Sequence, residues 1–95
     1  MYLNIPKPTN TLAEVLYGLI TRPEISEREY QFNGFRTRLS DLRLKYSLDV
    51  RHREVKAKNK FGRDMVYRVH YLWTIDVPQA IRVYEKINTD AKVHG

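Results

Sequence analysis

Apolar residues recur every three to four positions near the start of the chain, at the spacing of one face of an α-helix. Thr11 is followed three residues later by Glu14, which is the spacing of a capping box, so the helix is predicted to start near residue 10 or 11. Thr21-Arg22-Pro23 is predicted to end it, because proline disfavours helical conformation in the residue before it. The apolar stripe consists of Leu12, Val15, Leu16, Leu19 and Ile20.

Residues 1–9 precede this helix and are predicted to form an arm. Pro6 and Pro8 exclude a regular helix there, and a short edge strand is the alternative. Within the helix, Gly18 costs about 1 kcal/mol relative to alanine. We expect the missing side chain to permit a close crossing with another helix.

Two further helices are predicted before residue 47. Ser26 and Glu29 form a second capping box, and the Asn33-Gly34 turn signal limits the helix that it opens to a short one. A third helix is predicted over about residues 35–46, where apolar side chains share one face. These side chains belong to Phe35, Leu39, Leu42 and Tyr46.

The pattern then changes to the alternation that is typical of strands. The apolar residues Leu48 and Val50 are at even positions, whereas Val55 is at an odd position. Because neighbouring positions of a strand face opposite sides of the sheet, we expect a bulge or break near His52. Asn59-Lys60-Phe61-Gly62 predicts the tip of a hairpin. The return strand, over about residues 64–73, is predicted to carry large side chains at its odd positions. These are Met65, Tyr67, Val69, Tyr71 and Trp73.

A fourth helix is predicted after the hairpin. Asp76 is placed to cap it and Pro78 lies in its first turn. Residues 88–95 are predicted to be a frayed tail. The apolar stripe of this helix consists of Val77, Ala80, Ile81, Tyr84 and Ile87.

Composition narrows the class of protein. The 95 residues are enough for one domain with a modest core. The chain has no cysteine, which excludes disulfides and thiolate metal sites and fits a cytoplasmic protein. The start of the chain does not read as a signal peptide, and no run of about 18 apolar residues occurs, so no membrane association is predicted.

Positive charge is concentrated in one third of the chain. Residues 35–68 hold eleven basic and four acidic residues, a net charge of +7, whereas the remainder holds six basic and seven acidic residues, a net charge of −1. A charge excess confined to one segment indicates a polyanion as partner.

The order of helix, short helix, turn, helix and hairpin is that of a winged helix-turn-helix. The stretch from Gly34 to Arg43 resembles the recognition helix of small winged helix-turn-helix domains of bacteria and their phages, in which an R-[IL]-x-[DE]-L-R core precedes a hairpin with an N-[RK]-x-G tip. The resemblance covers roughly residues 10–73, and the chain departs from it by having Tyr46 where the family tends to have glycine. It implies DNA binding and an α+β fold of three helices plus a β-hairpin wing. Residues 74–95 would add an extra C-terminal helix and tail, for packing or dimerisation.

The third predicted helix would supply base contacts in the major groove, from Arg36, Thr37 and Ser40 near its N-terminus. The phosphate contacts would come from the rest of this helix and from the basic wing, about residues 51–68. Lysine on an edge strand has the alternative role of blocking aggregation. The predicted phosphate contacts are Arg38, Arg43, Lys45, Arg53, Lys56, Lys58, Lys60 and Arg63.

Several side chains of this segment have alternative roles inside the protein, without contact to DNA. Asp41 is expected to pair with Arg38 or Lys45, and Arg43 has the alternative of lying across the edge of the core. Leu44 is expected to be buried rather than to contact a thymine methyl group. Phe61 is expected to pack back on the sheet rather than to enter a minor groove.

No catalytic, metal or cofactor site is predicted. His52, His70 and His94 lack metal-ligand spacing, although His52 and His70 are expected to face each other on paired strands. No nucleophile with a base and no Gly-rich phosphate loop occurs, so the chain is not expected to be an enzyme. The aromatic side chains at odd positions of the return strand, Tyr67, Tyr71 and Trp73, are expected to form a core or subunit contact. Stacking on single-stranded bases is the alternative.

The sequence therefore predicts a sequence-specific protein that binds double-stranded DNA, of the kind that regulates phage or bacterial transcription. A homodimer would prefer half-sites about one helical turn apart. Two alternatives remain at this point. One is a winged-helix module that binds a host protein and inhibits or redirects a nucleic-acid enzyme. The other is a recombination accessory factor that bends DNA.

Overall fold

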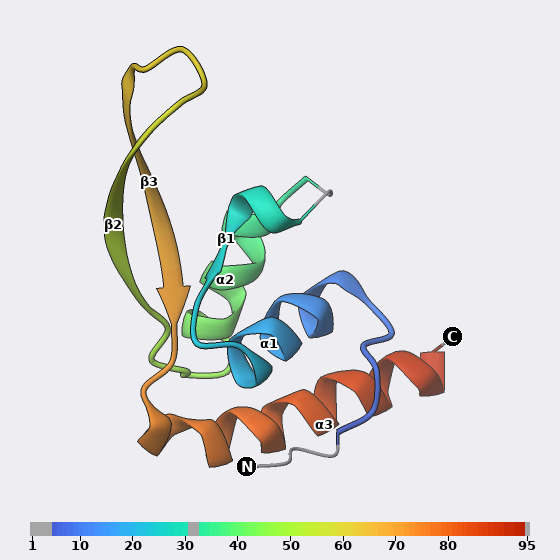
Figure 1. Cartoon of the computed structure of the whole chain (residues 1–95). Helices are drawn as coiled ribbons and strands as arrows, with labels where there is room; N and C mark the ends of the chain where they lie inside the picture. Colours follow the sequence, from blue (N-terminus) through green and yellow to red (C-terminus); the bar gives the residue numbers. More distant parts are fainter. Residues whose placement is uncertain (1–4, 31–32, 95) are drawn as a thin grey trace.

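A computed structural model describes residues 5–30 and 33–94 of the chain, with the side chains of residues 89–94 outside the description. In this part the fold is α+β, with three α-helices, two 3₁₀ turns and one three-stranded antiparallel sheet (Figure 1). The elements in chain order are α1 (Thr11–Thr21), β1 (Ile25–Ser26), η1 (Glu27–Glu29), α2 (Phe35–Leu44), β2 (Arg51–Lys58), β3 (Asp64–Tyr71), η2 (Thr74–Asp76) and α3 (Val77–His94).

Helix α1 starts and ends close to the predicted positions. Its N-cap is Asn10, whose side chain accepts a hydrogen bond of 2.8 Å from the Ala13 amide, so the predicted capping role of Thr11 is wrong. Asn10 precedes the first helical residue and is the residue type that caps best. Gly18 faces the Tyr30 side chain rather than another helix, which corrects the predicted helix crossing.

The segment after α1 differs most from the predicted pattern. Ile25 and Ser26 form a strand that was not predicted, pairing with His70 and Val69 of β3. The predicted second helix is only the three-residue turn η1, and the Ser26 side chain makes no capping hydrogen bond. Any continuation at residues 31 and 32 lies outside the described residues. The sheet order is therefore β1-β3-β2, with β3 in the centre.

Helix α2 ends two residues before the predicted end. Gly34 precedes it with a φ of 90°, a left-handed conformation that glycine adopts without steric cost. Phe35, Leu39 and Leu42 are buried as predicted. Tyr46 lies beyond the helix, and Ser47, with a φ of 56°, turns the chain toward the sheet.

The hairpin has a continuous register from Arg51 opposite Tyr71 to Lys58 opposite Asp64. The predicted bulge near His52 is therefore wrong. The apolar positions change from even to odd because Leu48 and Val50 precede β2 and enter the core from the connecting segment.

The hairpin tip is confirmed at residues 59–62. The Gly62 amide donates to the Asn59 carbonyl at 2.9 Å, and Gly62 has a φ of 80°. The Asn59 side chain accepts hydrogen bonds from the amides of Phe61 and Arg63. These contacts close the tip through local turn chemistry.

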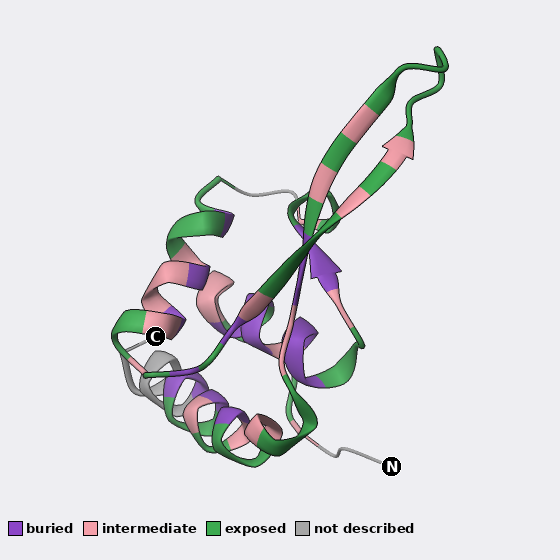
Figure 2. Cartoon of the chain, turned by 90° about the vertical axis from the view of Figure 1, so that its left-hand side faces the viewer, coloured by how far each residue is buried: buried purple, intermediate pink, exposed green. Residues whose placement is uncertain are grey.

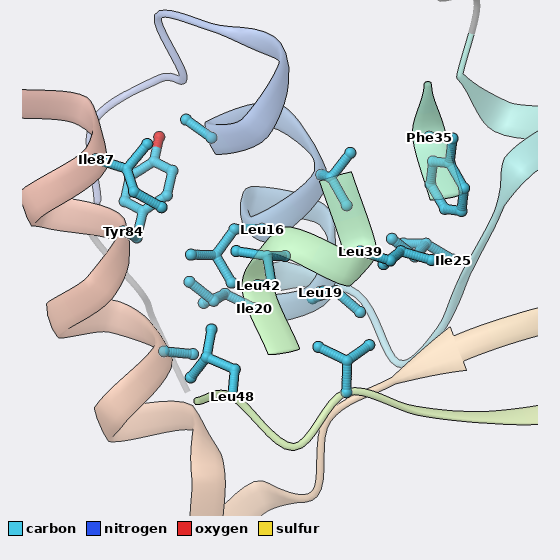
Figure 3. Packing of buried hydrophobic residues seen from close by; sticks show 14 residues of the cluster. Leu16, Leu19, Ile20, Ile25, Phe35, Leu39, Leu42, Leu48, Tyr84 and Ile87 are labelled. Carbon is cyan, nitrogen blue, oxygen red and sulfur yellow. The ribbon is translucent and has the colours of Figure 1, made fainter. Parts of the chain in front are cut away.

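The core lies where α1 is enclosed by α2, α3 and the connecting segments (Figure 3). The central part of the core brings together side chains of all three helices. These are Leu16, Leu19 and Ile20 of α1, Leu42 of α2 and Tyr84 of α3. Ile25 and Phe35 extend the core toward the sheet. The predicted stripe of α3 is borne out, with Ala80, Tyr84 and Ile87 buried and Val77 and Ile81 partly buried.

Helix α3 continues through His94, so the predicted frayed tail from residue 88 is wrong. Asn88 is buried and accepts hydrogen bonds of 2.9 Å from both the amide and the hydroxyl of Thr9. It also donates to the Lys7 carbonyl at 3.0 Å, and Tyr84 donates to the Pro6 carbonyl. The described end of the arm, residues 5–9, is therefore held along α3 and does not form the alternative edge strand.

Candidate nucleic-acid interface

The N-terminal end of α2 and the tip of the β2–β3 hairpin project to the same side of the molecule (Figures 1 and 2). Helix α3 lies along the opposite side. The hairpin extends well beyond the helical body, and most of its outer half is exposed (Figure 2). The two elements that carry the basic segment thus share one face.

The three predicted base contacts lie on α2. Arg36 and Thr37 are exposed and Ser40 is half-buried. The Arg36 Nε lies 3.3 Å from Glu27 Oε2 of η1, and the Arg36 side chain is 87% exposed. An ion pair this exposed contributes little stability, so it orients Arg36 without preventing another contact.

Two predicted phosphate contacts are engaged inside the molecule. Arg38 Nε donates to Thr11 Oγ1 at 3.1 Å, and Arg38 also lies 3.9 Å from Asp41. The predicted pairing of Asp41 with Arg38 is thereby confirmed. Arg43 Nε donates to the Val50 carbonyl at 3.0 Å, and both arginines are half-buried. Arg38 thus connects α2 to α1, and Arg43 connects α2 to the segment before β2. This agrees with the alternative prediction for Arg43, in which it lies across the edge of the core.

The remaining predicted phosphate contacts are exposed. Arg53 is paired with Glu24 at 2.7 Å. Within residues 5–30 and 33–94, no ion pair is found for the other five, although the Lys60 ammonium lies 5.2 Å from the centre of the Phe61 ring. These five are Lys45, Lys56, Lys58, Lys60 and Arg63. The four at the hairpin tip form a charged end that reaches away from the body.

Two apolar side chains of the basic segment are exposed, contrary to prediction. Leu44 at the end of α2 is 81% exposed and Phe61 at the hairpin tip is 77% exposed. Helix α3 packs on α1 and leaves Leu44 uncovered, and Phe61 does not pack back on the sheet.

A cleft of about 540 Å³ lies where η1, the first turn of α2 and the hairpin meet. Two of its arginines, Arg28 and Arg68, were not among the predicted contacts. Arg68 belongs to the basic segment, so its charge alone could have indicated a contact from the sequence. The cleft could not be predicted in this way, because it depends on η1 lying beside the sheet. The charged and aromatic residues of the cleft are Glu27, Arg28, Arg36, Glu54, Tyr67 and Arg68.

His70 of β3 is buried. Its ring centre is 5.6 Å from that of Phe35 and 6.1 Å from that of His52, so the predicted facing of the two histidines is confirmed. Burial, together with the nearby Arg43 guanidinium, lowers the pKa of His70 to about 4. His70 Nδ1 is buried with no hydrogen-bond partner in the described part of the chain. No group of three or more His, Cys, Asp or Glu residues able to hold a metal ion occurs among the residues described.

The odd-numbered face of the hairpin carries the aromatic stripe. Tyr67 and Tyr71 are half-buried and Trp73 is 49% exposed. The Arg51 guanidinium lies 3.6 Å from the centre of the Trp73 ring, and that of Arg28 lies 5.2 Å from the centre of the Tyr67 ring. Cations thus cover part of the aromatic surface.

Comparison of the chain with protein-family models, with curated proteins and with solved structures found no match. Among the described helices, none has an apolar stretch long enough to cross a lipid bilayer.

Proposed function

We propose that the chain is a winged helix-turn-helix protein that binds double-stranded DNA at a specific sequence and regulates transcription in a bacterium or phage. In this proposal α2 enters the major groove and the β2–β3 hairpin lies on the phosphate backbone. The observation that carries the proposal is the placement of the N-terminal end of α2 and the basic hairpin tip on one face, opposite α3.

The dimensions of helix α2 are compatible with this arrangement. An α-helix with its side chains is about 10–12 Å in diameter, and the major groove is about 12 Å wide and admits one helix. The exposed polar side chains of the first two turns of α2 include Arg36 and Thr37. An arginine at such a position makes two hydrogen bonds to guanine.

The distribution of charge also supports it. The basic segment of 35–68 has a net charge of +7, and its four tip side chains Lys56, Lys58, Lys60 and Arg63 are exposed. Phosphate contacts of this kind provide affinity without reading sequence. The helix would therefore select the site and the hairpin would strengthen binding to any duplex.

In vitro selection from random duplexes, performed at a stated salt concentration, tests the proposal. We expect a defined sequence to be enriched, with a steep fall in affinity as salt increases. Absence of enrichment together with weak binding of all duplexes would contradict it. Recovery of a host protein by the chain, with DNA binding still weak, would instead favour the protein-binding alternative.

A second candidate is an accessory factor that bends DNA, and the exposure of Phe61 favours it. An apolar side chain at the end of a basic hairpin can insert between base pairs in the minor groove and kink the duplex. Fluorescence transfer between the ends of a bound duplex measures this bend. For this candidate, Phe61→Ala removes the bend while the selected sequence stays the same.

A further inference from the structure

The cleft at the base of the hairpin shares Arg36 with the proposed groove contacts, but its other lining residues take no part in the groove and tip contacts. It lies between η1, the first turn of α2 and the hairpin strands, and its volume is about 540 Å³. This is within the range of about 300–1,000 Å³ that is typical of ligand sites. The cleft is therefore large enough for a bound group.

Three arginines from three different elements line this cleft: Arg28 from η1, Arg36 from α2 and Arg68 from β3. They are eight and 32 residues apart along the chain, so only the fold brings them together. Two carboxylates, Glu27 and Glu54, share the cleft, which leaves one positive charge in excess.

The neighbours of two of the arginines orient their side chains. Arg28 lies over the Tyr67 ring at 5.2 Å, and Arg36 is hydrogen-bonded to Glu27 at 3.3 Å. Arg68 is opposite Glu54 in the strand register, yet it has no ion pair in the described part of the chain. An exposed arginine without a carboxylate partner, beside two oriented ones, is suited to an added anion.

We propose that this cleft binds a phosphate group of the DNA backbone, with Arg68 and Arg28 as the principal contacts. Guanidinium groups bind phosphate through paired hydrogen bonds, which favours arginine over lysine at such a site. The inference rests on the proposed function and adds a backbone contact between the groove helix and the hairpin tip. One DNA strand would cross the molecule at this point.

Salt-titrated binding of the full chain tests the contact. The probes are the selected duplex and an unrelated duplex of equal length. Arg68→Gln and Arg28→Gln are each expected to reduce the slope of log affinity against log salt by about one, for both duplexes.

Arg82→Gln is the matched control, because it removes the same charge from an exposed position on α3, away from the hairpin. We expect it to leave the slope unchanged. If Arg68→Gln and Arg82→Gln change the slope equally, the effect is one of net charge and the proposed contact is wrong. Circular dichroism of each variant verifies that the fold is retained.

Duplexes in which single phosphates are replaced by neutral methylphosphonates locate the contact. Replacement at one position should weaken the wild-type chain but leave Arg68→Gln unaffected, because the variant has already lost that interaction. If every replacement weakens both proteins equally, no phosphate is coupled to Arg68, and the inference fails although DNA binding itself stands.

A free nucleotide offers the same phosphate chemistry, and NMR of the arginine side chains distinguishes the two sources. The Arg68 Nε–Hε signal is expected to shift on addition of the duplex and to show only weak, millimolar binding of inorganic phosphate or a deoxynucleotide monophosphate. Tight binding of the nucleotide that persists with duplex bound would assign the cleft to a small molecule and overturn the inference. If the wild-type chain binds no duplex at all, the proposed function fails separately.

Discussion

The Tyr30 hydroxyl occupies the space beside Gly18 that a side chain at residue 18 would fill. The Tyr30 ring is packed against Phe35, with ring centres 5.1 Å apart. Burial raises the pKa of Tyr30 to about 12, against the opposing effect of the nearby Arg22 guanidinium. Gly18 thus allows the Tyr30 side chain to lie directly on α1.

We expect Gly18→Ala to destabilise the protein, although alanine is favoured in a helix by about 1 kcal/mol. The added methyl group would overlap the Tyr30 hydroxyl and lie 3.1 Å from Ile25 Cγ2. Overpacking of this kind costs about 1–3 kcal/mol, so the net loss in the free energy of unfolding should be about 1 kcal/mol. Urea denaturation measures it.

Tyr30→Phe removes the overlapping oxygen and provides the control. In that background, Gly18→Ala should be close to neutral, because mainly the Ile25 contact remains. An equal loss in both backgrounds would show that the cost does not come from the Tyr30 hydroxyl.

Asn88 holds the arm against α3, and we expect Asn88→Ala to lower the free energy of unfolding by about 2 kcal/mol. The substitution leaves the Thr9 amide and the Lys7 carbonyl without the partner they have now. Lys86→Ala, at an exposed position of the same helix, should have little effect. Hydrogen exchange of the Thr9 amide should accelerate in Asn88→Ala alone. Unchanged exchange there would contradict the anchoring role.

Stability should decrease as pH falls from about 6.5 to 4, with His70 as a principal cause. Its pKa is about 4 in the folded state and near 6.5 in the unfolded chain, so the unfolded state binds more protons in this interval. The contribution is complete above pH 6.5 and is lost as pH falls to 4; because each pKa unit corresponds to about 1.4 kcal/mol, we expect a loss of about 3 kcal/mol.

Urea denaturation at pH 7 and pH 5 checks this. His70→Phe should reduce the difference in stability between the two pH values, since it removes the titrating ring beside Phe35. His52→Asn, at an exposed position, should retain most of the difference. A His70→Phe variant with an undiminished pH dependence would assign the effect to other groups.

Arg36 and Lys60 should differ in what they contribute to DNA binding. Arg36→Ala is expected to reduce discrimination against a changed guanine by about 1–3 kcal/mol. Lys60→Ala is expected to weaken all duplexes alike and to lower the salt slope by about one. Affinities for the selected duplex and its single-base variants, at one salt concentration, separate these effects. Equal losses on every duplex for Arg36→Ala would remove it from the base-reading role.

The parts of the fold that depend on local spacing could be predicted from the sequence. The apolar stripes of α1, α2 and α3 give the correct helices and most of the core, because the helical period decides which side chains share a face. The hairpin tip follows from turn residues such as Gly62, whose positive φ needs no distant contact. The concentration of charge in one segment is likewise a property of the sequence.

Contacts between distant segments could not be predicted in this way, because they depend on how the elements pack together. A two-residue strand such as β1 is too short to show a pattern, and it forms because β3 offers it backbone partners. Arg38 and Arg43 have the same charge as the exposed lysines of the hairpin, yet the packing of α2 turns them inward. Asn88 was predicted to lie in a frayed tail, whereas it is buried and hydrogen-bonded to Thr9 of the arm. The cleft with Arg68 exists because η1, α2 and β3 meet in space, and no local spacing encodes that meeting.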